Sequence, residues 1–154
     1  MLPLVLLAAC SIDPETTLET VHLTEQTVID AFDAHDVQGI MRSYADDAVV
    51  ITAGAEPQVG SAAIRAAFEK TLADPGLTME FTPGPAWAGK SGELAVTTGT
   101  TRYTTRAEDG EPHVVTMNNQ TVWHKATDTK SRVAGLGWKI VSVYNIAQDA
   151  AAGS

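Results

Sequence analysis

Residues 44–51 read YADDAVVI and mark the point where the helical spacing of apolar residues gives way to strand-like alternation. A second stretch, GLGWKIV at 135–141, leads into the last strand-like segment. Helices early in a chain, followed by strands that pair antiparallel, are typical of α+β domains. We therefore predict a cone-shaped α+β fold, in which a strongly bent antiparallel sheet wraps around N-terminal helices and encloses a ligand-sized cavity.

Three helices are expected in the first half of the chain. Asp13 is placed to cap the first helix, with Pro14 in its first turn, where a missing N–H costs nothing. A long amphipathic repeat follows. Apolar spacing predicts a second, short helix over residues 37–44 that includes Tyr44. Ser61 is a plausible N-cap for the third helix.

Alternation predicts five strands, at residues 48–52, 77–81, 94–106, 114–125 and 138–146. The PGP run at 83–85 is expected to bend or interrupt the sheet, and Gly99 to mark a bulge or bend within a strand. EDGE at 108–111 predicts a hairpin turn. We expect one domain over 24–147, followed by a flexible tail at 148–154.

The composition excludes several classes of function. The chain has 154 residues, 44% of them hydrophobic, which is enough for one domain with a core of its own. Its net charge is −9, and it shows no cluster of Lys and Arg that would displace the counterions of a nucleic acid. We therefore expect no nucleic-acid partner, and membrane attachment only through a lipid anchor.

The N-terminal segment has the features of an export signal. Residues 1–9 read MLPLVLLAA, too short to span a bilayer, and lead directly into Cys10, the only cysteine. The LAAC sequence at 7–10 resembles the lipobox of bacterial lipoproteins. This implies a signal segment at 1–10, lipidation of Cys10, a tether over 11–23 that runs into the first helix, and export to the cell envelope. No Lys or Arg precedes the apolar run, and the alternative is an apolar tail with an incidental cysteine on a cytoplasmic protein.

Five stretches together carry a family resemblance: YADDAVV (44–50), GSAAIRAAF (60–68), GELAVTTG (92–99), TVWHK (121–125) and GWKIV (137–141). Their succession resembles the nuclear transport factor 2-like superfamily, and within it the SnoaL-like and ketosteroid-isomerase-like bacterial proteins. The resemblance covers residues 24–146 and implies the cystatin-like cone and a homodimer formed through the exposed sheet face. The superfamily includes isomerases, cyclases, dehydratases, hydrolases and binding modules, so the fold alone does not identify the function.

The catalytic positions of the ketosteroid isomerases hold neutral residues here. By the resemblance, the carboxylate base corresponds to Thr52, the protonated acid to Thr121, and the tyrosine donor falls near Val28. A hydroxyl without a base beside it does not remove a carbon-bound proton at neutral pH. The resemblance therefore predicts no ordinary ketosteroid isomerase chemistry.

Strand alternation supplies candidate cavity residues instead. With Thr121 facing inward, its strand also presents Met117, Asn119 and Trp123. The complete set of candidates is Tyr44, Thr52, Trp87, Met117, Asn119, Thr121, Trp123 and Asn145. This apolar and aromatic wall with a few neutral polar groups is suited to a small apolar molecule with a polar handle. The alternative is that these side chains only fill the core, although amides are rarely buried without partners.

The sequence gives no support for a metal or cofactor. The four histidines show no metal-binding spacing, and there is no Cys cluster or phosphate-binding Gly loop, so we expect neither. Three functions remain open: a small-molecule-binding protein, an isomerase, cyclase or hydrolase built around Thr52, Asn119 and Asn145, or a homodimeric assembly module. A buried Asp, Glu or His in the cavity would favour the enzyme.

Overall fold

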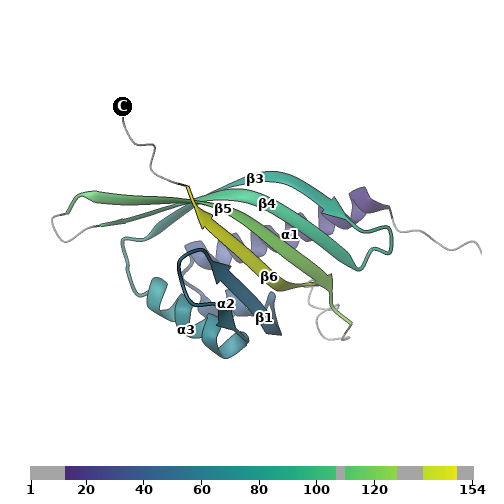
Figure 1. The fold of residues 1–154 in the computed structure, drawn as a ribbon, viewed down its shortest axis with the longest axis horizontal. Coiled ribbons are helices and arrows are strands. Elements are labelled where there is room, and N and C mark those ends of the chain that lie inside the picture. Colours follow the sequence, from purple (N-terminus) through teal and green to yellow (C-terminus); the bar gives the residue numbers. More distant parts are fainter. Residues whose placement is uncertain (1–12, 107–109, 128–136, 149–154) are drawn as a thin grey trace, which may run out of the picture.

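The computed structural model describes residues 13–106, 110–127 and 137–148. Within them the order of elements is α1 (Pro14–Asp33), α2 (Val37–Met41), β1 (Tyr44–Thr52), β2 (Gln58–Val59), α3 (Ser61–Thr71), β3 (Thr78–Ala88), β4 (Leu94–Arg106), β5 (Pro112–Lys125) and β6 (Trp138–Ala147). The fold is the predicted α+β cone (Figure 1). No helix in the described ranges is long and apolar enough to cross a membrane.

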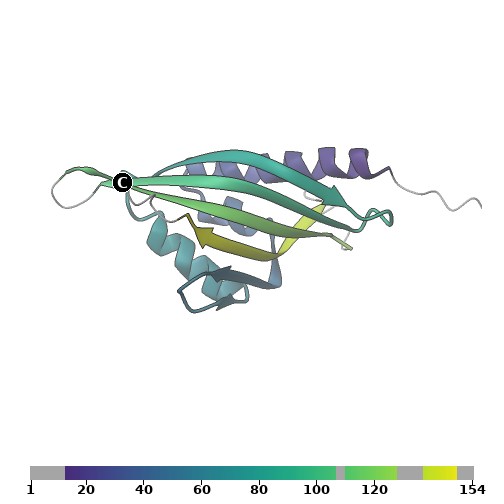
Figure 2. The same cartoon turned by 45° about the horizontal axis from the view of Figure 1, so that its top comes forward.

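Helix α1 starts where the sequence predicts. The Asp13 side chain accepts a hydrogen bond from the backbone N–H of Thr16, and Pro14 occupies the first turn. Val21 and Phe32 are buried on its inner face. The helix therefore lies with its apolar stripe against the sheet, along β3 (Figure 2).

Two boundaries differ from the sequence prediction. Tyr44 is the first residue of β1 rather than the end of a helix, because α2 stops at Met41 and the chain extends after Ser43. The predicted cap at Ser61 is wrong: Gly60 occupies the N-cap position with φ 84°, a conformation that favours glycine, and no side chain caps the helix.

The six strands form one sheet in the order β2-β1-β6-β5-β4-β3. All neighbouring strands are antiparallel except β1 and β6, which pair in parallel. The two-residue strand β2 is not among the five predicted strands, and it pairs with β1 through Val49 and Val59. Strands β4 and β5 pair as a hairpin up to Arg106 and Pro112, although residues 107–109 of the expected turn lie outside the described residues.

Strand β3 runs through the PGP stretch instead of ending there. Its register with β4 shifts between Pro83 and Ala86, so the bulge lies in β3 and not at Gly99, where β4 keeps its pairing with β5. A side chain at Gly99 would meet the Phe81 ring, because an added Cβ would lie 2.4 Å from it. Glycine at this position leaves room for the Phe81 ring against β4.

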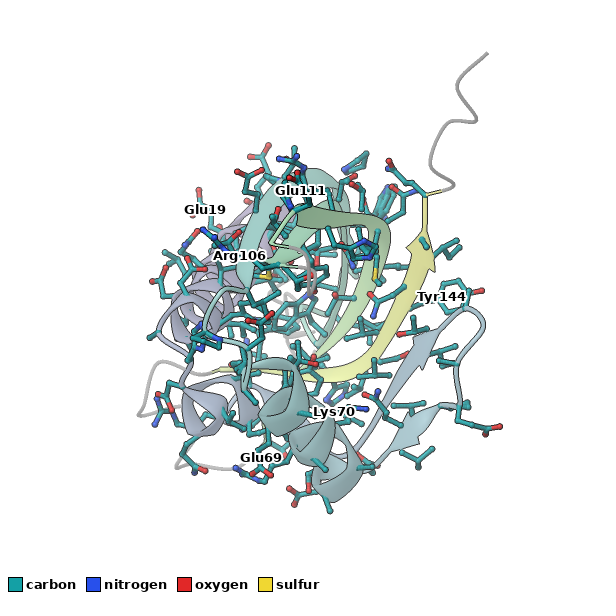
Figure 3. All side chains as sticks on the ribbon, turned by 90° about the vertical axis from the view of Figure 1, so that its left-hand side faces the viewer. Glu19, Glu69, Lys70, Arg106, Glu111 and Tyr144 are labelled. Carbon is teal, nitrogen blue, oxygen red and sulfur yellow. The ribbon has the colours of Figure 1, made fainter. Side chains whose placement is uncertain are left out.

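The sheet curls around the helices, as the view along the strands shows (Figure 3). Ile40, Ile64 and Trp123 are almost fully buried between the concave face and the helices. Trp138 is also buried, and its indole N–H donates to the Thr20 hydroxyl at 3.0 Å, which ties β6 to α1. The helices thus close one side of a hollow whose other side is the sheet.

Candidate functional site

A cavity of about 420 Å³ lies between the concave face of the sheet and helices α1 and α3. Most of its wall is apolar, and includes Val28, Phe32, Phe68, Met79, Phe81, Val115, Met117 and Val143. Its volume is within the range of small-molecule sites in proteins. The cavity is therefore large enough for a ligand.

The structure brings together most of the side chains that the sequence selects for this cavity. Tyr44, Thr52, Met117, Asn119, Thr121, Trp123 and Asn145 all line it. Trp87 does not, and it is 59% exposed. The bulge in β3 explains the difference: Met79 and Phe81 face inward before it, whereas Ala86 and Ala88 do so after it, which turns Trp87 outward.

Four polar side chains form a continuous hydrogen-bonded row on the cavity wall, which we call the amide row: Thr52, Thr101, Asn119 and Asn145. The Thr101 hydroxyl donates to Asn119 Oδ1 at 2.6 Å, and Asn119 Nδ2 donates to Asn145 Oδ1 at 2.8 Å. Asn145 Nδ2 lies 3.4 Å from Thr52 Oγ1, a longer and weaker bond. The row crosses β4, β5, β6 and β1, since Asn119 and Thr52 are the register partners of Asn145.

Glu25 is a cavity residue that the sequence analysis missed. Its side chain is only 13% exposed, and its Oε1 accepts a 2.7 Å hydrogen bond from the buried Thr97 hydroxyl. Thr97 in turn accepts from the Trp123 indole N–H at 2.9 Å. Glu25 is four residues after the buried Val21 and three before Val28, so helical spacing alone would have placed it on the inner face.

Two tyrosines make the middle of the wall aromatic and uncharged. Burial, and secondarily the nearby Tyr103, raises the pKa of Tyr44 far above its usual value, and burial also raises the pKa of Tyr103. Tyr103 packs against Phe32 with ring centres 5.9 Å apart, and Tyr44 against Phe68 at 5.8 Å. Both phenols therefore keep their protons at neutral pH.

The other ionisable residues in the described ranges are not part of the cavity wall. Asp46 and Asp47 are exposed on β1, and Asp36 caps α2 through the Gly39 N–H. His35, with φ 53°, lies at the break between α1 and α2, where its ring Nδ1 is 3.0 Å from the Leu72 carbonyl oxygen. Among the described residues, no three His, Cys, Asp or Glu side chains are grouped so as to hold a metal ion. Cys10 lies outside the described ranges.

The model of the SnoaL-like domain family matches residues 26–149. No curated protein matches the chain in sequence. Among solved structures, the chain is similar to a ketosteroid isomerase-like protein of Erwinia carotovora atroseptica, with a TM-score of 0.68 and 15% identity over 84% of this chain and 95% of that one. It is also similar to an NTF2-like protein with a cystatin-like fold from Novosphingobium aromaticivorans (TM-score 0.66, 17% identity, 90% and 86% covered). An NTF2-like protein of Pseudomonas putida gives a TM-score of 0.68 at 19% identity, with 87% and 88% covered. At these identities the similarity is one of fold.

Proposed function

The chain belongs to the SnoaL-like domain family of the nuclear transport factor 2-like superfamily, and we propose that it binds a small, mainly apolar molecule in its cavity. The observation that carries this proposal is the amide row set into a mostly apolar wall. Burying an amide costs free energy unless it is hydrogen-bonded, so two asparagine side chains bring no advantage to a core that only has to be filled. They do bring an advantage to a ligand-binding wall, because polar groups fix the orientation of an apolar ligand.

The amide row keeps hydrogen-bonding capacity for a ligand. An asparagine amide has two N–H donors, and the bonds described above engage one donor of Asn119 and one of Asn145. Thr52 accepts through its oxygen, which leaves its own proton available as a donor. Ligand carbonyl, ether or hydroxyl oxygens are the groups that such donors recognise.

Filling the cavity tests the proposal. Ala67 lines the cavity from α3, whereas its neighbour Ala66 is exposed on the same helix. Ala67→Trp should weaken the binding of a neutral apolar dye such as Nile red by about tenfold or more, and Ala66→Trp should leave it unchanged. Fluorescence titration measures both affinities. Equal affinity in the two variants, or no dye binding by the unmodified protein, would refute the proposal.

A catalytic function is the second candidate, and Glu25 is the observation that favours it. A carboxylate at the wall of an apolar cavity is the type of group that removes a proton from a bound molecule. An enzyme of this kind would exchange the α-protons of a bound alkyl ketone for solvent deuterium, and Glu25→Gln would abolish the exchange. A rate equal to that in buffer would exclude this chemistry for such ketones.

A further inference from the structure

Glu25 lies apart from the amide row, at a different place on the cavity wall. Resting on the proposed function, we propose that Glu25 makes the cavity selective for an apolar molecule that carries a protonated amine. Alcohols of the same shape bind more weakly, and carboxylates bind least. Two directed hydrogen bonds, the charges around the cavity and the separation of its two polar places support this selectivity.

The hydrogen bonds around Glu25 run in one direction. The indole N–H of Trp123 only donates, so the Thr97 oxygen accepts from it. The single proton of Thr97 is then directed to Oε1 of Glu25. Glu25 therefore acts as an acceptor, and its carboxyl group is oriented by the buried Thr97, which the buried Trp123 of the neighbouring strand fixes in turn.

The second carboxylate oxygen has a less confined environment. Glu25 Oε2 lies 3.3 Å from Nδ1 of the exposed His22, one turn earlier on α1. Glu25 lines both the cavity and a neighbouring hollow that His22 and Pro83 border. An ionised carboxylate accepts about four hydrogen bonds, of which these contacts account for two, so capacity remains for a donor from the ligand.

The charges of the wall favour a cation. Among the described residues that line the cavity, Glu25 is the only carboxylate, and none is Lys or Arg. Tyr44 and Tyr103 add no charge at neutral pH, as argued above. A ligand cation beside Glu25 gains electrostatic attraction in an environment of low dielectric, whereas a ligand anion meets repulsion there.

The positions of the polar groups suggest the length of the ligand. Along β4, Thr97, which bonds to Glu25, is two residues from Gly99, the register partner of Asn119, and four residues from Thr101. The two polar places are therefore about 7 to 13 Å apart at the rise of a strand. A decyl chain is about as long as the larger of these distances, so its amine can reach Glu25 while its tail extends past the nearer end of the amide row.

The test compares three molecules that differ only in their head groups: decylamine, decanol and decanoate. Titration calorimetry of the complete chain at neutral pH should show decylamine binding about tenfold more tightly than decanol, and decanoate more weakly than decanol. Glu25→Gln should abolish the preference for the amine, because the amide oxygen still accepts from Thr97 but carries no charge. Glu19→Gln, which removes the same charge from an exposed position of α1, should keep it.

The outcomes separate this inference from the function on which it rests. Binding of decanol or decanoate as tight as that of decylamine overturns the role of Glu25 and leaves the binding function standing. Retention of the amine preference in Glu25→Gln overturns it as well. Binding of none of the three molecules, together with no binding of Nile red, overturns both.

Discussion

At the end of β6 the two faces of the sheet reverse the usual distribution of polar and apolar side chains. On β6, Asn145 points into the cavity, whereas its neighbours Tyr144 and Ile146 are exposed on the outer face. Tyr144 points away from the cone in Figure 3. A sheet that packs on a core normally buries its apolar residues and exposes its polar ones. The reversal indicates that both faces of β6 are shaped by something other than the stability of a lone chain.

The two faces also differ in what covers their side chains: the inner amides have hydrogen-bond partners, and the outer apolar groups lack a cover within the described part of the chain. The inward amides bond to one another across the strands, so their burial carries little penalty. The outward Tyr144 and Ile146 border a shallow hollow over β3 to β6 that the described part of the chain leaves uncovered. The inner face thus satisfies these amides within the chain, whereas the outer face presents apolar area to solvent.

The largest expected effect comes from replacing a buried and an exposed isoleucine of β6 by alanine and comparing the two variants. Ile140 and Ile146 both lie on β6, but Ile140 is 3% exposed and Ile146 is 45% exposed. Ile140→Ala should lower the free energy of unfolding by about 2–5 kcal/mol, because it leaves a cavity in the core. Ile146→Ala should change it by less than about 1 kcal/mol. Urea unfolding, at protein concentrations low enough that copies of the chain do not associate, measures both, and equal losses would contradict the assignment of faces.

A second prediction concerns what covers the outer face. We propose that a second copy of the chain packs there, as the resemblance to the superfamily implies and the exposed Tyr144 and Ile146 support. Tyr144→Glu should weaken the dimer by about 2 kcal/mol or more, because it places a charge in an apolar interface. Light scattering after size-exclusion chromatography gives the mass. A monomeric unmodified protein would refute the proposal, and Glu19→Gln is the control for the surface.

The smallest effect concerns the aromatic wall of the inner face. Below about pH 10 the tyrosine phenols keep their protons in both the folded and the unfolded chain. Above about pH 10 the unfolded chain loses them first, because burial raises the pKa of Tyr44 in the folded chain. Stability should therefore fall as pH rises above about 10, by up to about 1.4 kcal/mol per pH unit for each such tyrosine. Tyr44→Phe should make this decline shallower. Urea unfolding between about pH 9 and 11 tests it, and an unchanged slope would contradict the prediction.

Periodicity was enough to predict the α+β class and the long strands, because helical and alternating patterns reflect which face is buried. The pair Asp13 and Pro14 predicted the start of the first helix through its capping chemistry. Trp87 could not be placed by counting, since one bulge reverses the alternation for all residues after it. The parallel pairing of β1 with β6 depends on contacts across the whole chain. Helical spacing could have placed Glu25 on the inner face of its helix. It could not predict the hydrogen bond to Thr97, or the bond from Trp123 to Thr97, because these partners lie far away in the sequence.

The position of β6 in the sheet has a consequence for how the protein is made. β6 follows every other strand in the sequence, yet it lies between β1 and β5, and it alone joins the two parts of the sheet. While the chain is being synthesised, β1 and β2 have no strand through which to join β3, β4 and β5. Asn145 also arrives with β6, so the amide row is assembled last. In a nascent chain that lacks its last strand, Asn145 is absent, so Asn119 and Thr52 are not linked and the amide row is incomplete.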